Sequence, residues 1–135
     1  MKEAKMEGLA HVELFVSDIK KTKAFYTEIL GFEVIHETTG QEGDDIVKIC
    51  FLKSGNLILC AAEFPTYTKS EDGIINHFAI SVTNIEKVKE KLEKKGLKTW
   101  EKDEITYAPN YWDNGTKWIL FRGPDGERLE LCEIL

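Results

Sequence analysis

Two nine-residue stretches of this chain match each other: HVELFVSDI, from His11 to Ile19, and HFAISVTNI, from His77 to Ile85. They begin 66 residues apart (77 minus 11), close to half of the 135 residues. Each stretch has the apolar and β-branched residues of a strand, followed by a residue that can begin a helix. A repeat of this kind predicts two copies of one structural unit, with the two histidines at equivalent positions.

The residues after each match run in the same order, a helix that ends at a glycine and then three strands. In the first half we expect strands at 9–16, 32–36, 46–53 and 57–64, a helix over 19–30 and an acidic loop over 38–45. In the second half we expect strands at 76–82, 97–100, 116–122 and 128–134, a helix from 85 to 95 and a long loop over 102–115. The order predicts an α+β fold with two β-α-β-β-β modules, 9–64 and 76–135, joined by a linker over 65–75 within one domain, 1–135.

Charge and composition exclude several classes of partner. A net charge of −6 without a basic stripe argues against nucleic-acid binding. No apolar run approaches the roughly 20 residues of a membrane span, and the charged first residues lack the apolar core of a signal peptide. Three cysteines without a CxxC pair are typical of reduced thiols in the cytoplasm. We therefore expect a cytoplasmic protein that acts on a small molecule.

The chain resembles the vicinal oxygen chelate superfamily, which includes glyoxalases, bleomycin-resistance proteins and extradiol dioxygenases. The resemblance is carried by the repeated histidine stretches and by two further motifs, Phe25-Tyr26-x3-Leu30-Gly31-Phe32 and Gly123-Pro-Asp-Gly-x2-Leu-Glu130-Leu. It implies two modules whose sheets form a half-open, glyoxalase-like barrel around one site, and it implies a homodimer.

The resemblance also implies a divalent metal ion, Ni, Zn, Co, Mn or Fe, held by His11, His77 and Glu130. A carboxylate in the apolar run around Glu130 is costly to bury unless a cation compensates it. Metal-dependent isomerases of the family usually add an acid from the last strand of the first module. Matching Leu57-Ile-Leu-Cys60 to Leu129-Glu-Leu-Cys132 predicts Ile58 at that position, so three protein ligands would remain and leave room for a chelating substrate.

Three functions fit these residues. The first is a metal-dependent lyase or isomerase, similar to lactoylglutathione lyase, with Glu130 as the catalytic base. The second is an Fe(II) extradiol dioxygenase that uses the same His-His-Glu set as a facial triad. The third is a non-enzymatic, drug-sequestering protein of the bleomycin-resistance type. We expect Tyr107, Tyr111 and Trp112 to bind the substrate or ligand, although aromatic residues are equally typical of a subunit interface.

Other side chains near the expected site are placed by strand alternation. Glu13 is expected on the same side of its strand as His11, whereas Glu63 is expected on the opposite side of its strand from Ile58. Cys60 shares the side of Ile58, and we interpret it as a buried structural thiol.

Overall fold

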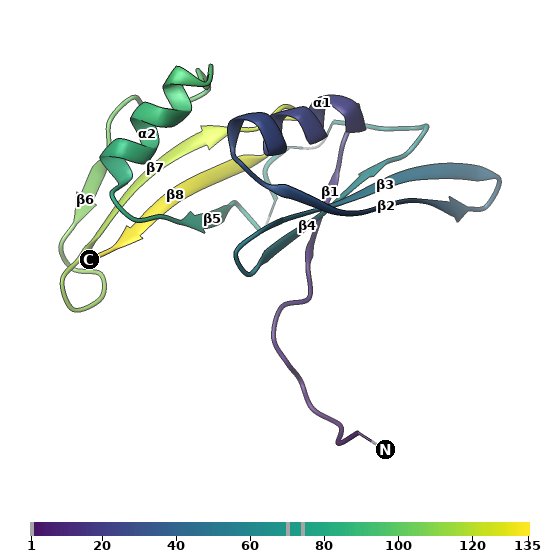
Figure 1. The fold of residues 1–135 in the computed structure, drawn as a ribbon, viewed down its shortest axis with the longest axis horizontal. Coiled ribbons are helices and arrows are strands. Elements are labelled where there is room, and N and C mark those ends of the chain that lie inside the picture. Colours follow the sequence, from purple (N-terminus) through teal and green to yellow (C-terminus); the bar gives the residue numbers. More distant parts are fainter. Residues whose placement is uncertain (1, 70, 74) are drawn as a thin grey trace.

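Each half of the chain forms one four-stranded sheet with a helix packed against it (Figure 1). The computed structural model describes residues 2–69, 71–73 and 75–135. The first half contains β1 (Val12–Phe15), α1 (Ile19–Ala24), a π-helical turn η1 (Phe25–Ile29), β2 (Glu33–Glu42), β3 (Asp45–Ser54) and β4 (Leu57–Glu63). The second half contains β5 (Phe78–Ser81), α2 (Ile85–Lys94), β6 (Thr106–Ala108), β7 (Thr116–Arg122) and β8 (Arg128–Ile134).

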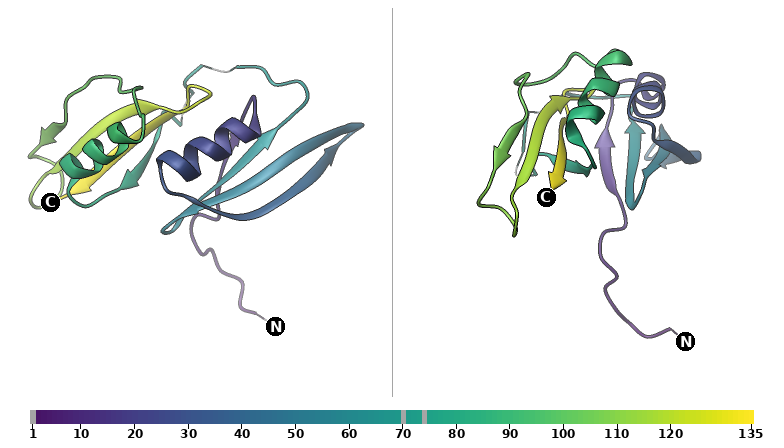
Figure 2. Two further views of the ribbon diagram at one scale, coloured as in Figure 1. Left: turned by 45° about the horizontal axis from the view of Figure 1, so that its top comes forward. Right: turned by 60° about the vertical axis from the view of Figure 1, so that its left-hand side comes forward.

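The two sheets have the same topology, which confirms the predicted α+β fold. Their strand orders are β1-β4-β3-β2 and β5-β8-β7-β6. In each sheet the first strand pairs in parallel with the last, and the other pairs are antiparallel. Both helices lie on the same side of the molecule, so the opposite faces of both sheets are left uncovered (Figures 1 and 2). No helix in the described ranges has the length and apolarity needed to cross a bilayer.

Equivalent residues begin the two helices. Asp18 caps α1 by accepting hydrogen bonds from two backbone N–H groups, and Asn84 caps α2 by accepting one from the Lys87 N–H, where the sequence allows Ser17 or Asp18 and Thr83 or Asn84. Each helix start also receives a glutamate from the last strand of its own sheet. Glu63 accepts from the Ile19 N–H at 2.8 Å, and Glu133 accepts from the Ile85 N–H at 3.0 Å. A carboxylate at this end of a helix is stabilised by the unpaired N–H groups there.

Strand register corrects the predicted alignment of the two halves. Glu13 lies opposite Cys60 in the first sheet, and its repeat equivalent Ala79 lies opposite Glu130 in the second. Cys60, and not Ile58, therefore occupies the position equivalent to Glu130. The matching roles of Glu63 and Glu133 in capping the helices give the same offset of 70 residues.

Two predicted elements differ in the structure. The stretch 97–100 is not a strand, because only Trp100 makes an isolated bridge, to Phe121. The second strand of the second module is instead β6, inside the expected loop over 102–115. In the first module, the expected acidic loop over 38–45 is mostly paired, because β2 and β3 form a long hairpin that turns at residues 43–44.

The helix-facing sides of the two sheets share one hydrophobic core. Tyr26 and Leu59 from the first half belong to the same buried cluster as Ile85, Phe121 and Leu129 from the second. Because one residue in two on each strand faces this core, the alternate residues face the uncovered side of each sheet. Phe15 is one of these, and 63% of its surface is exposed.

The turn at 123–127 of the second module is hydrogen-bonded to the first module. The fully buried Tyr26 donates its hydroxyl to Glu127 Oε2 at 2.9 Å, and the Ser17 N–H donates to Asp125 Oδ1 at 3.1 Å. Burial raises the pKa of the Glu127 carboxyl. This contact fixes the relative orientation of the two modules at the edge where their sheets meet.

Removing the Tyr26 hydroxyl is expected to lower stability. Tyr26→Phe removes the hydroxyl donor of Glu127 Oε2, whereas Glu127 Oε1 keeps the Asp125 N–H, and an unpaired buried acceptor typically costs about 1–3 kcal/mol of unfolding free energy. Burial raises the pKa of Glu127 in the folded state. The contribution of the Glu127 carboxyl to the free energy of unfolding is therefore fully present below its pKa in the unfolded chain and is lost as pH rises through its folded pKa. Urea unfolding of the wild type and Glu127→Gln across pH 4–8 measures this. A difference between the two proteins that stays constant with pH would contradict it.

Candidate metal and substrate site

Two of the three expected metal ligands meet on the uncovered face of the second sheet. His77 directly precedes β5, and Glu130 lies on the neighbouring β8. His77 Nε2 is 2.7 Å from Glu130 Oε2, and the side chains are 35% and 14% exposed. Glu130 faces this side because Leu129 and Leu131, which flank it, point into the core. An imidazole and a carboxylate in contact are suitable donors for a divalent transition metal.

A cavity of about 540 Å³ opens over this pair. It is lined by the face of the second sheet and by the loop that follows β6, and its walls are largely aromatic or apolar. The aromatic residues are Tyr111, Trp112 and Trp118. Trp112 is 68% exposed and has a left-handed backbone with φ of 59°, which is uncommon for a bulky residue. Backbone strain of this kind is often kept where a side chain has to be presented for binding.

Tyr107 does not line this cavity. On β6 it is opposite Lys117, and the cavity is lined instead by its neighbours Thr106 and Ala108. Alternation along the strand therefore points Tyr107 to the other face of the sheet. There it passes over Gly115, where a Cβ atom would come within 2.8 Å of the Tyr107 ring. The predicted aromatic wall thus keeps Tyr111 and Trp112, and Trp118 takes the place of Tyr107.

His11 lies on the first sheet, away from the other two expected ligands. Its ring packs edge-on against Phe51, with ring centroids 5.9 Å apart, and His36 contacts the same phenyl ring at 6.1 Å. Glu13 shares this face, as expected from alternation, and its Oε1 is 4.0 Å from the Cys60 thiol. Burial raises the pKa of the Cys60 thiol, so it is present as a neutral thiol near neutral pH.

The single chain therefore brings together a pair of ligands and not a complete metal site. Among residues 2–69, 71–73 and 75–135, no group of three or more His, Cys, Asp or Glu side chains is arranged to hold a metal ion. The donor types of His77 and Glu130 fit a divalent metal, but two protein ligands are fewer than the three of a typical catalytic site. A catalytic metal site at this pair would need a third ligand from outside this face of the chain.

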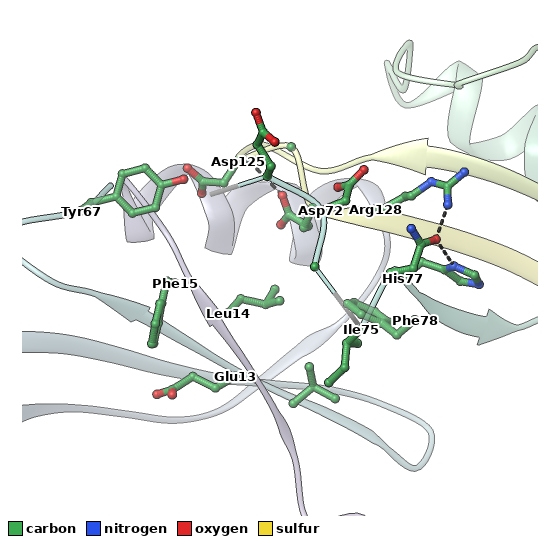
Figure 3. Close-up of a pocket in the computed structure, with 16 residues that line it drawn as sticks. Glu13, Leu14, Phe15, Tyr67, Asp72, Ile75, His77, Phe78, Asp125 and Arg128 are labelled. Carbon is green, nitrogen blue, oxygen red and sulfur yellow. Dashed lines mark hydrogen bonds between the residues drawn. The ribbon is translucent and has the colours of Figure 1, made fainter. Parts of the chain in front are cut away.

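A second cavity, of about 560 Å³, lies where the two modules meet (Figure 3). It is bounded by β1, by the connecting segment before β5 and by the turn around Asp125. Glu13 and Phe15 line it from the first module, and His77 and Phe78 line it from the second. His77 thus borders both cavities, so the joint between the modules and the aromatic cavity share one side chain.

Sequence reasoning missed several residues of the aromatic cavity, among them Arg128 and Trp118. Arg128 is two residues before Glu130 on the same strand, so alternation along β8 already places it on the same face. Trp118 offers no such local signal, because its position depends on pairing with β8 at Cys132.

Comparisons with known proteins agree with this architecture. The family model described as "Glyoxalase/Bleomycin resistance protein/Dioxygenase superfamily" matches residues 8–131. The crystal structure of a glyoxalase family protein from Enterococcus faecalis is similar, with a TM-score of 0.74 and 31% identity, covering 94% of this chain and 98% of that chain.

Two further relatives carry a named activity or ligand. "Glutathione transferase FosA" from Serratia marcescens is 28% identical over 93% of this chain and 80% of its own length. A mutant of FosX, a genomically encoded fosfomycin resistance protein from Listeria monocytogenes, was solved with Mn(II) and 1S,2S-dihydroxypropylphosphonic acid. It has a TM-score of 0.66 and 25% identity, covering 94% of this chain and 92% of that chain.

Proposed function

Since the chain belongs to the Glyoxalase/Bleomycin resistance protein/Dioxygenase superfamily, we propose that it is a metal-dependent, glyoxalase-like enzyme of the lyase or isomerase type. Its substrate would be a small molecule with vicinal oxygens, as in lactoylglutathione lyase. The observation that carries the proposal is the His77–Glu130 contact of 2.7 Å at the base of a largely aromatic cavity. Its three cysteines are free, in keeping with a cytoplasmic location.

The complete metal site in this proposal belongs to a homodimer. His77 and Glu130 of one copy would supply two ligands, and His11 of a second copy would supply the third. Two features support this arrangement. The faces that carry these residues are uncovered on the same side of the molecule (Figure 2). Phe15, on the face of His11, is also more exposed than a phenylalanine in a sheet normally is, which is typical of a surface buried on assembly.

The bound metal would polarise the substrate oxygens and make a neighbouring C–H group or a water more acidic. The residues of this chain have separate roles. Glu130 would accept and return the proton, because it is the carboxylate among the described residues that line the cavity. Tyr111, Trp112 and Trp118 hold the apolar part of the substrate and exclude water from it.

The charged residues that line the cavity favour a substrate that has no strongly anionic group. Among the described residues that line it, Arg128 is the basic side chain beside Glu130, and it already donates to Glu101 and to Asn76. We therefore propose a substrate that is recognised by chelation and by aromatic contact, and not one held chiefly by a phosphonate.

A second candidate function is an Fe(II)-dependent extradiol dioxygenase, and strand register favours it. Cys60 stands where a fourth acidic ligand would be expected, so the site would keep two histidines and one carboxylate, as in a facial triad. A sequestering protein without turnover is the remaining alternative, and in that case the aromatic wall alone would bind the ligand.

One experiment separates these functions. Metal content is measured by mass spectrometry on protein purified through a tag that does not bind metal. The loaded protein is then tested for hemithioacetal isomerisation and for O₂ uptake with catechols. Isomerisation with Ni, Zn, Co or Mn supports the proposal, whereas O₂ uptake that depends on Fe(II) supports the alternative. Tight ligand binding without metal or turnover would refute both enzymatic functions.

Trp112 is expected to contribute directly to ligand binding. Trp112→Ala removes an exposed ring from the cavity wall, and a stacking contact of this type is worth about 0.5–1.5 kcal/mol beyond its buried area. Affinity for a planar aromatic ligand should fall by about tenfold, as measured by calorimetry. Tyr107→Ala is the matched control, because Tyr107 lies on the other face of the sheet. Equal losses in both variants would contradict the assignment of the wall.

A further inference from the structure

A continuous chain of polar contacts runs from the His77–Glu130 pair to the segment that connects the two modules, and Figure 3 shows the part of it around His77 and Arg128. Each member contacts the next through a hydrogen bond or an ion pair. In order, the chain comprises Glu130, His77, Asn76, Arg128, Glu101, Arg122 and Asp72. None of the last five residues is a candidate metal ligand, so their arrangement needs a separate explanation.

The contacts of Asn76 determine which ring nitrogen of His77 carries a proton. A guanidinium group only donates hydrogen bonds, so the Asn76 side-chain atom that meets Arg128 must be the amide oxygen. The same oxygen is 2.9 Å from His77 Nδ1, so Nδ1 must be an N–H donor. The ring then presents Nε2 toward Glu130, at 2.7 Å.

Arg128 is held in place from its other side. Glu101 accepts from Arg128 Nε at 2.8 Å and from its terminal nitrogen at 2.9 Å, which is the two-point geometry that fixes a guanidinium plane. Arg122 also reaches Glu101 at 2.8 Å, and Asp72 accepts from both terminal nitrogens of Arg122 at 2.6 and 2.9 Å. The orientation of the Asn76 amide is therefore determined by paired charges and not by Asn76 alone.

We propose that Asn76, Arg128 and Glu101 are positioning residues that keep the proton of His77 on Nδ1 and leave Nε2 free for a metal ion. The metal-binding part of this inference rests on the proposed function, but the proton position does not. Outer partners of a metal-binding histidine fix its tautomer and ring orientation, and their loss typically lowers metal affinity by about 10- to 100-fold. Asp72 extends the same network to the connecting segment, so the joint between the modules and the orientation of His77 are coupled.

The test compares Asn76→Ala, Asn76→Asp and Glu101→Gln with the wild type. Glu86→Gln is the control, because Glu86 is an exposed carboxylate that pairs with Lys117 at 2.6 Å in the same module and lies outside the network. Zn(II) affinity is measured by competition with a chelator. The Nδ1–H proton of His77 is followed by NMR in protein with ¹⁵N-labelled histidine, both with and without Zn(II), and the signal is assigned as the one missing from His77→Gln.

In the wild type we expect a slowly exchanging Nδ1–H signal in both states. Asn76→Ala should lose it and bind Zn(II) about 10- to 100-fold more weakly, and Glu101→Gln should show a smaller loss. Asn76→Asp should restore both properties, because a carboxylate oxygen also accepts from Arg128 and from Nδ1. Unchanged signal and affinity in Asn76→Ala would overturn the inference.

A wild type that takes up none of Zn, Ni, Co and Mn would refute the proposed function and not the positioning role. The Nδ1–H signal of the metal-free protein would still decide that role, because the contact with Asn76 is present without metal. Loss of the signal in Asn76→Ala would then support the network, and its retention would overturn it.

Discussion

Glu130→Gln is expected to lower the affinity for divalent metal by more than about 100-fold, because a directly bound ligand matters more than the outer partners whose loss gives about 10- to 100-fold effects. The amide is nearly the same size as the carboxylate, so packing against the flanking core residues is preserved. It lacks the negative charge that Glu130 needs for its proposed roles as a metal ligand and a base. Metal affinity and turnover should therefore be lost together, while the folded structure remains.

The matched control is Glu90→Gln, which makes the same change at an exposed site on α2, where Glu90 pairs with Lys94 at 3.2 Å. Metal content by mass spectrometry and thermal unfolding are measured on both variants and on His77→Ala. Wild-type metal content in Glu130→Gln would remove Glu130 from the ligand set. Loss of metal with a strongly lowered melting temperature would instead indicate a damaged fold, and the far-UV circular dichroism of the variant distinguishes these outcomes.

Much of the fold could be predicted because its signals are local. The helix caps at Asp18 and Asn84, the glycines that follow each helix and the alternation of strands all depend on residues a few positions apart. Because the sequence is duplicated, the order of helices and strands in the second half could be predicted from the first half. The two sheets have the same topology because two copies of one unit bury the same face against equivalent helices.

The fourth-ligand position was wrong for a physical reason. A strand has a side-chain period of two, so moving one strand along its partner by two residues keeps every side chain on its original face. The apolar pattern around Ile58 and Cys60 therefore fits the second half equally well at either offset. Only the hydrogen-bonded register, which pairs Glu13 with Cys60 and Ala79 with Glu130, distinguishes the two.

The meeting of His77 with Glu130 could be predicted, but the position of His11 relative to them could not. His77 directly precedes β5 and Glu130 lies on β8, and these two strands pair in one sheet, so local topology brings the two side chains together. His11 belongs to the other sheet, where its ring packs on Phe51, and nothing in a single sequence says which surface faces that ring. The faces that carry these residues are uncovered in one chain (Figure 2), as a site shared between two copies requires.

Heterodimers of two inactive variants are expected to recover about half of the metal, because each site of a symmetric dimer would draw on both copies. One copy carries His11→Ala and keeps His77 and Glu130. The other carries Glu130→Gln and keeps His11. In the mixed dimer one site then has all three ligands, and the other site has lost two.

The two variants are co-expressed with different peptide tags that do not bind metal, and the mixed dimer is isolated by two successive affinity steps. Metal is measured by mass spectrometry beside each homodimer. We expect about one tightly bound ion per mixed dimer and almost none in either homodimer, because isologous pairing makes the two sites independent copies. If each site were built within one chain, the mixed dimer would bind almost no metal, because each of its two chains would lack one ligand.

The same experiment also tests whether His11 is a ligand at all. Full metal content in the His11→Ala homodimer would show that the third donor is another residue, and Glu13 and Cys60, which share the face of His11, would be the first to replace. If metal returns in the mixed dimer, activity should return with it at about half the value of the wild type per dimer, because catalysis needs the same complete site. Metal without activity would mean that residues beyond the three ligands must also be intact in both halves of the dimer.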